Sequence, residues 1–165
     1  MSGSLGKTMN LADQITTQGP EPTILVVDDN KGVLEFLLLL LSKHGLSVIG
    51  ASSGNQCLNI VKTRPVSLII LDVMMPAMDG LEVCQELKKT IPSIPIILLT
   101  ARDDMATRAA AMDLGVSEFV AKPVNNRDLL DRVRVQLRNL EWDKTADQAF
   151  WRIEKSTRGA GPKKP

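Results

Sequence analysis

Leu68-Ile-Ile-Leu-Asp72 is the stretch that decides the fold, because four apolar residues in a row end at a carboxylate. A run that is apolar at every position is typical of a strand covered by helices on both faces, as in a parallel sheet. Four further short runs are Ile24 to Val27, Ser47 to Ala51, Ile94 to Leu99 and Glu118 to Ala121. The alternation of these runs with longer stretches predicts an α/β fold with five parallel strands.

The stretches between the runs carry apolar residues three or four positions apart, as expected for helices that bury one face. They include Cys57 with Val61, Val83 with Leu87, Met105 with Ala109 and Met112, and Leu129, Leu130, Val133 and Leu137. Gly45 and Gly115 are placed to end the first and fourth helices, and His44 to cap the first. The apolar run Leu37 to Leu41 is far shorter than the roughly 20 residues of a spanning helix, which predicts a buried helix instead.

The chain is long enough for one domain with a short appendage at each end: it has 165 residues, of which 44% are hydrophobic and 24% charged. A net charge of +1 supplies no field that would favour a nucleic acid or a membrane as partner. We expect a flexible leader over residues 1–22, a domain over 23–140, and a C-terminal extension or linker over 141–165. That last segment is either a helical continuation of the last helix or the first piece of an output domain.

Cys57 and Cys84 are far apart in the sequence, and no histidine near them suggests a metal site. Both read as buried thiols. Free thiols together with an N-terminus unlike a signal peptide predict a cytoplasmic protein.

Polar side chains follow four of the five apolar runs at the point where each run ends. They are Asp28 and Asp29, Asp72, Thr100, and Lys122 with Pro123. Ligands of an open parallel sheet bind beyond the carboxyl ends of its strands. Each of these residues alone has a structural explanation, but together they place three carboxylates, a hydroxyl and an ammonium at one edge.

Three carboxylates at close range repel one another, with each pair at 4 Å costing on the order of 4 kcal/mol at an effective dielectric of 20. Mg²⁺ suits such all-oxygen ligands, and Lys122 supplies further positive charge. With phosphoryl oxygens neutralised in this way, one carboxylate can attack phosphorus and form an acyl phosphate. Asp72 is the expected nucleophile because it ends the central strand, whereas the neighbours Asp28 and Asp29 are better placed to hold metal.

Thr23 to about Leu140 resembles the receiver domain of two-component response regulators. The motifs that carry the resemblance are Ile24-Leu-Val-Val-Asp-Asp-Asn30, Leu71-Asp-Val-Met-Met-Pro-Ala-Met-Asp-Gly80, Leu99-Thr-Ala-Arg102 and Phe119-Val-Ala-Lys-Pro123. The resemblance implies a doubly wound, flavodoxin-like parallel sheet in the order 2-1-3-4-5, surrounded by five helices. It also implies a histidine kinase or a phosphotransfer protein as phosphoryl donor, and a chain that catalyses only its own phosphorylation and slow dephosphorylation.

Site roles follow from the same resemblance. Asp72 would be the phosphoacceptor and a magnesium ligand, Asp29 a direct ligand, Asp28 a ligand through water, and Met74 a ligand through its backbone carbonyl. Thr100 and Lys122 would each contact a phosphoryl oxygen. Pro76 and Gly80 would shape the loop after Asp72, and the Lys122-Pro123 bond would be cis. Phe119 would be either an aromatic switch residue coupled to Thr100 or an ordinary core aromatic.

Two further expectations concern lifetime and output. Met74 and Arg102 occupy positions where relatives with fast hydrolysis carry acids or amides, so the phosphoryl group should be long-lived.

The segment from Lys122 to Asn139 resembles receivers of winged-helix transcription factors, which pair through the fourth helix, fifth strand and fifth helix. Reciprocal ion pairs between Arg108 and Asp128, and between Glu118 and Arg132, would then support a weak homodimer on phosphorylation, with no direct nucleic-acid binding by this segment.

Two alternatives remain. An aspartate-nucleophile phosphohydrolase also uses Mg²⁺ on a parallel sheet, but usually carries an Asp-x-Asp pair after its first strand, where this sequence has Asp28-Asp29-Asn30. A degenerate receiver would keep the fold as a binding module without phosphorylation, although every acceptor-site residue is present here.

Overall fold

A five-stranded parallel sheet forms the centre of the molecule in the computed structural model, which describes residues 21–101 and 104–158. The strand order is β2-β1-β3-β4-β5, as expected from the sequence. The strands are β1 (Thr23–Val27), β2 (Ser47–Ala51), β3 (Leu68–Asp72), β4 (Ile96–Ala101) and β5 (Glu118–Lys122). The fold is therefore the doubly wound, flavodoxin-like α/β class.

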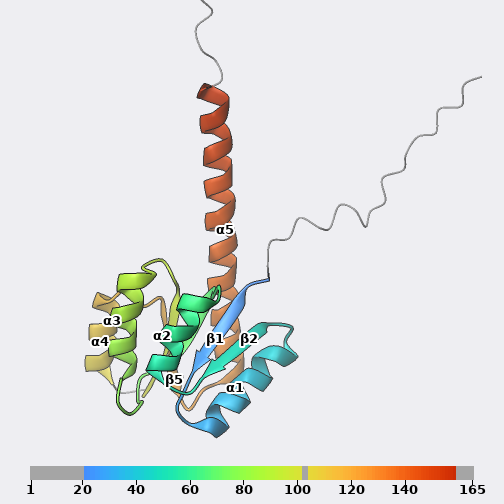
Figure 1. The fold of residues 1–165 in the computed structure, drawn as a ribbon. Coiled ribbons are helices and arrows are strands. Elements are labelled where there is room, and N and C mark those ends of the chain that lie inside the picture. The colour runs from blue at the N-terminus through green and yellow to red at the C-terminus, as the bar shows by residue number, and fades with distance from the viewer. Residues whose placement is uncertain (1–20, 102–103, 159–165) are drawn as a thin grey trace, which may run out of the picture.

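Five helices connect the strands and cover both faces of the sheet (Figure 1). They are α1 (Lys31–Lys43), α2 (Gly54–Thr63), α3 (Gly80–Thr90), α4 (Met105–Asp113) and α5 (Asn126–Arg158). One core layer lies between the sheet and helices α2, α3 and α4, and the other lies between the sheet and helices α1 and α5. Each βαβ crossover places its helix on a face, which is why parallel strands are buried on both sides.

β3 shows why the apolar runs are continuous. Leu68 and Ile70 belong to the layer under α1 and α5, whereas Ile69 and Leu71 belong to the layer under α2, α3 and α4. Successive side chains of a strand point to opposite faces, so a strand with two core layers needs apolar residues at every position. All five residues of β3 are buried, including Asp72 at its end.

Local signals in the sequence fix the ends of α1 and α4. Gly45 and Gly115 adopt positive φ angles of 77° and 75° just after these helices, as expected for glycines that end a helix. The Nδ1 of His44 lies 2.8 Å from the carbonyl oxygen of Leu40, so His44 caps α1. The single histidine thus has a structural role.

The expectation that Leu37 to Leu41 forms a wholly buried helix is wrong in part. Leu37 and Leu41 are fully buried, but Leu39 is 54% exposed and its neighbour Phe36 is 48% exposed. A helix turns 100° per residue, so an unbroken apolar run must present some of its residues to solvent when the helix packs on one face. Among the described residues, no helix is both long and apolar enough to cross a membrane.

α5 has 33 residues and spans about 50 Å, whereas a five-residue strand spans only about 17 Å. Figure 1 shows α5 running past the end of the sheet as one rod. Residues 141–158 therefore continue the last helix, and whether the segment leads into an output domain stays open. The predicted leader falls mostly on residues 1–20, which lie outside the described part of the chain.

Candidate functional site

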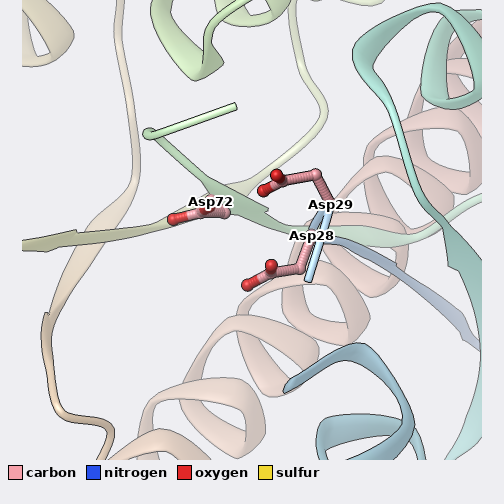
Figure 2. A group of neighbouring side chains, drawn as sticks. All are labelled: Asp28, Asp29 and Asp72. Carbon is pink, nitrogen blue, oxygen red and sulfur yellow. The ribbon is translucent and has the colours of Figure 1, made fainter. Parts of the chain in front are cut away.

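Asp28 and Asp29 follow β1, and Asp72 ends β3. The two strands are adjacent and parallel, with Val27 opposite Leu71, so all three carboxylates come to the same edge of the sheet. One oxygen from each carboxylate lies within 4.8 Å of the others (Figure 2). Asp28 and Asp72 are buried and Asp29 is exposed, which makes a cluster with one side open to solvent.

Lys122 brings a positive charge to this cluster from the end of β5. Its Nζ lies 2.6 Å from Oδ1 of Asp72 and 3.6 Å from Oδ2 of Asp28. The lysine side chain is 35% exposed, whereas the two carboxylates are almost completely buried. The ammonium group therefore reaches from the rim of the site towards its floor.

The electrostatic balance of the cluster is unfavourable for three ionised carboxylates. Burial raises the pKa of Asp72 above its ordinary value, and the hydrogen bond and positive charge of Lys122 oppose that rise. Oδ1 of Asp72 and Oδ2 of Asp28 are buried, and apart from their ion pairs with Lys122 neither has a hydrogen-bond partner among the described residues. One ammonium beside three carboxylates leaves net negative charge and free oxygen lone pairs, which is the donor set that a hard divalent cation such as Mg²⁺ prefers.

Thr100 is buried in β4, where Leu99 pairs with Asp72 and Thr100 itself pairs with Ala121 of β5. This register puts the threonine at the same sheet edge as Asp72 and Lys122. Its hydroxyl donates to the Ala101 carbonyl at 3.5 Å, a long hydrogen bond that leaves the group able to find a better partner.

The loop that follows Asp72 is fixed by Gly80 and by a cap that we did not predict. A Cβ on Gly80 would lie 2.5 Å from the carbonyl oxygen of Asp72 and 2.7 Å from Cα of Val73, so only glycine fits there. Asp79 and Glu82 form a capping box at the start of α3. The Asp-x-x-Glu spacing was visible in the sequence, since an N-cap acid followed by glutamate three residues later is a recognised helix start.

Met74 follows β3, and its role as a metal ligand through the backbone carbonyl stays a prediction. The side chain of Met74 is 75% exposed in the loop after β3. The Lys122-Pro123 bond is cis. Arg102 lies outside the described residues.

Phe119 is half-buried and packs against the core layer beneath α2, α3 and α4. The guanidinium carbon of Arg108, on α4, lies 5.8 Å from the centre of the Phe119 ring. This cation–π distance is within the usual range, and the Arg108 Nε is buried without a hydrogen-bond partner among the described residues. Sequence reasoning missed the contact because nothing in the spacing of the two residues relates α4 to β5.

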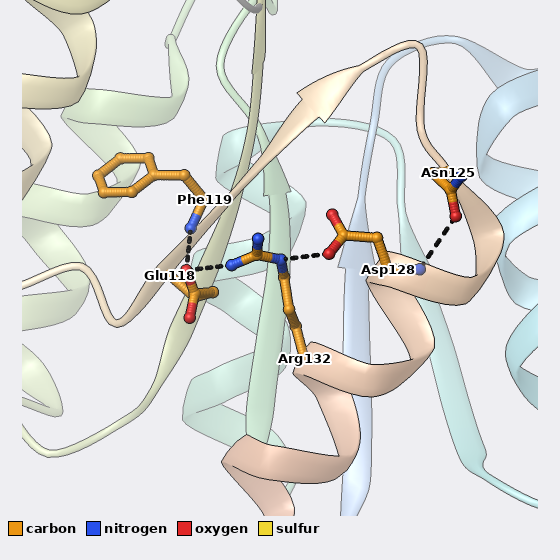
Figure 3. A network of polar contacts seen from close by, with 5 residues as sticks. All are labelled: Glu118, Phe119, Asn125, Asp128 and Arg132. Carbon is orange, nitrogen blue, oxygen red and sulfur yellow. Dashed lines mark hydrogen bonds and ion pairs between the residues drawn. The ribbon is translucent and has the colours of Figure 1, made fainter.

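Arg132 joins two carboxylates within one chain (Figure 3). Its Nε donates to Oδ1 of Asp128 at 2.9 Å, and its Nη1 pairs with Oε1 of Glu118. Asn125 accepts a hydrogen bond from the backbone N–H of Asp128 at 3.1 Å, which fixes the first turn of α5. Glu118, Asp128 and Arg132, which were expected to pair between two copies, are thus paired inside the chain, and the intermolecular pairing stays a prediction.

Comparisons with known proteins agree with this geometry. The family described as response regulator receiver domain matches residues 24–134. The response regulator MprA of Mycobacterium sp. (strain KMS) is 42% identical over 124 residues, which cover 75% of this chain and 54% of that protein. MprA of Mycobacterium ulcerans (strain Agy99) is 43% identical over 126 residues, with the same two shares. The chain spans about half the length of these curated relatives.

Two solved structures illustrate the similarity of fold. The signal receiver domain of an HD domain-containing protein from Pseudomonas fluorescens Pf-5 superposes with a TM-score of 0.73 at 29% identity, covering 79% of this chain and 97% of that one. A CheY-like response regulator receiver domain protein from Methanospirillum hungatei JF-1 gives a TM-score of 0.72 at 26% identity, covering 75% and 99%.

Proposed function

The chain belongs to the family of response regulator receiver domains of two-component signalling, and we propose that it accepts a phosphoryl group on Asp72 in a magnesium-dependent reaction. The observation that carries the proposal is the 2.6 Å contact between Lys122 and Asp72 within a cluster of three carboxylates. A nucleophilic carboxylate, a cation for the phosphoryl oxygens and a metal-binding donor set are the parts that phosphoryl transfer to aspartate requires.

In the proposed reaction an oxygen of Asp72 attacks phosphorus, and the bond from phosphorus to the donor breaks. With phosphohistidine as donor, the imidazole nitrogen leaves with the bonding electrons and takes a proton from solvent. Asp29, Asp72 and the Met74 carbonyl would hold Mg²⁺ directly and Asp28 would hold it through water, and the ion would supply positive charge for the phosphoryl oxygens.

Lys122 acts both before and after phosphoryl transfer in this proposal. Before the reaction it favours the ionised form of Asp72, because its ammonium opposes the rise in pKa that burial causes. Afterwards it pairs with an oxygen of the phosphoryl group, and the Thr100 hydroxyl exchanges its long bond to Ala101 for a shorter one to another phosphoryl oxygen. A shift of Thr100 towards Asp72 would let Phe119 move inward and so change the face formed by α4, β5 and α5, as a population shift between two states.

Acetyl phosphate with Mg²⁺ tests the proposal. Mass spectrometry should detect one added phosphoryl group on the wild-type chain and none on Asp72→Asn or in excess chelator. Lys122→Gln should slow the reaction by about 10²-fold, since it removes a preorganised charge from the transition state. Asp79→Asn is the matched control, because it removes a nearby carboxylate that only caps α3 and should leave the rate unchanged. An adduct that persists in Asp72→Asn would refute the assignment.

The same experiment separates the two alternatives. A degenerate receiver would take up no phosphoryl group under any of these conditions. A phosphohydrolase would turn over an aryl phosphate repeatedly and lose that activity with Asp28→Asn and not with Asp72→Asn. The donor in the cell is, in this proposal, a histidine kinase or a phosphotransfer protein.

A further inference from the structure

The end of α5 extends away from the body of the domain. Leu129, Leu130 and Val133 in its first turns are buried against the sheet, and Leu140 lines a shallow hollow with Val66 and Ile91. Lys144 lines the same hollow, and beyond it the helix continues to Arg158 and stands clear of the other described helices and strands in Figure 1. Helices in proteins owe most of their stability to the packing of an apolar face, so this segment needs a surface to pack against.

A second stripe, apolar at every position except Asn139, runs along α5 at a spacing that alternates between four and three residues. Its positions are Val135, Asn139, Trp142, Ala146, Ala149 and Ile153. A repeat of 3.5 residues is the signature of a two-stranded coiled coil. Val135 is 40% exposed, and Asn139 is exposed and lines a hollow together with Ser117. Leu137 packs against the domain core, so the stripe begins on side chains that are still open to a partner.

The charges beside the stripe indicate which partner fits. With Val135, Trp142 and Ala149 at d positions, Arg138 falls at a g position and Asp143 at the following e position. In a parallel pair of identical helices, g of one helix faces the next e of the other, which brings Arg138 opposite Asp143 of the second copy. An antiparallel pair would bring like charges together.

Asn139 supports the same partner and orientation. It occupies an a position, where an asparagine meets its own counterpart across a parallel dimer and specifies register and dimeric state at some cost in stability. The stripe covers fewer than three heptads and includes two alanines, so its affinity should be modest, with a dissociation constant on the order of micromolar.

We propose that residues 135–153 of α5 pair with the same segment of a second copy as a parallel two-stranded coiled coil, which holds two receiver domains together before phosphorylation. The proposed phosphorylation of Asp72 is not required for this association. The pairing is also distinct from the proposed dimer face that contains Arg108, which phosphorylation would favour.

Sedimentation equilibrium of the full, unphosphorylated chain tests the proposal. Wild type should approach twice the 18.0 kDa of one chain at tens of micromolar. Ala149→Glu places a charge in the stripe and should give a monomer, whereas the matched control Gln148→Glu adds the same charge at the neighbouring c position and should stay dimeric. Uptake of a phosphoryl group from acetyl phosphate and an unchanged helical content show that each variant is folded. A monomeric wild type, or a dimer that tolerates both changes equally, would overturn the proposal.

Disulfide cross-linking tests the parallel orientation. Ile153→Cys puts identical residues opposite each other only in a parallel pair, so mild oxidation should give a covalent dimer, and Gln148→Cys should not. The native thiols should not interfere, because Cys57 and Cys84 are buried and burial raises the pKa of each to about 12. Arg138→Asp and Asp143→Arg should each weaken the dimer and together restore it. Equal cross-linking at both cysteines, or no restoration by the double change, would refute the parallel register.

Discussion

Nζ of Lys122 lies 2.6 Å from Oδ1 of Asp72, so the lysine that reaches the three carboxylates contacts the one that is proposed to be the nucleophile. The contact joins the last residue of β5 to the last residue of β3 across the intervening strand β4. The contact offsets part of the free-energy cost of burying an ionised Asp72. The part that is not offset should lower the stability of the folded chain.

Asp72→Asn should raise the free energy of unfolding near pH 7 in the absence of divalent cations. Burial raises the pKa of Asp72 above the value it has in the unfolded chain, so ionisation favours the unfolded state. The stabilising contribution of the protonated acid is present below the unfolded pKa and lost as the pH rises through the folded pKa. The advantage of the asparagine variant should therefore shrink as the pH falls towards about 4.

Urea unfolding at several pH values measures this difference. Asp29→Asn is the control, since that carboxylate is exposed and its removal should change stability less. A variant Asp72→Asn that is less stable than wild type at pH 7 would show that Lys122 stabilises the charge more than burial penalises it.

Gly80→Ala should destabilise the chain by about 1–3 kcal/mol or more, because the new Cβ would overlap the backbone of Asp72 and Val73. Backbone atoms cannot move aside cheaply, so the loop after Asp72 must shift and the reaction with acetyl phosphate should slow as well. Gly32→Ala is the matched control: its Cβ would have only the Asn30 side chain at 3.4 Å, and alanine favours the helix by up to about 1 kcal/mol. Equal effects of the two changes on unfolding would remove the steric explanation.

Met74→Asn should shorten the life of the phosphorylated state. The methionine side chain is largely exposed beside the acceptor and offers no strong hydrogen bond to an attacking water, whereas an amide can orient one. Arg102, the second position expected to matter, lies outside the described residues, and Arg102→Glu should add to the effect. Loss of the adduct followed by mass spectrometry gives the half-life. A wild-type half-life of seconds at neutral pH would contradict the prediction of a slow reaction.

Beryllofluoride, a phosphoryl mimic, should strengthen contact between two receiver domains through the face formed by α4, β5 and α5. Sedimentation with and without beryllofluoride measures the association. The Ala149→Glu variant is used for this measurement, because it should lack the coiled-coil pairing of residues 135–153. Arg108→Glu should abolish the response and Asp128→Arg should partly restore it.

The gain in affinity between two copies through this face should be small. Asp128 and Glu118 already pair with Arg132 within the chain, so intermolecular pairs replace existing ones. Association that is insensitive to both charge reversals would show that these residues only solvate the surface.

The sequence predicted the sheet and the position of the site because both follow from local patterns. Strands buried on two faces need unbroken apolar runs, and polar residues at the ends of parallel strands must meet at one edge. Asp28, Asp72 and Lys122 could therefore be brought together without any knowledge of distances.

Side-chain partners across elements could not be predicted in this way. Arg132 has three acids within five residues or on a neighbouring strand, and its choice of Glu118 and Asp128 depends on how α5 lies against β5. The stacking of Arg108 on Phe119 likewise depends on the position of α4 relative to the sheet. The exposure of Leu39 escaped prediction because an unbroken apolar run carries no sign of which face will be covered.

The strand order also dictates how the site is completed during synthesis. The first three strands of the chain, β2, β1 and β3, are contiguous in the sheet, so they can pair while the rest is still being made. Such an intermediate already gathers Asp28, Asp29 and Asp72, but Lys122 arrives only with the last strand. A half-made domain would therefore hold concentrated negative charge beside the open edge of β3. Pairing of β4 covers that edge, and the later pairing of β5 brings Lys122 to the carboxylates.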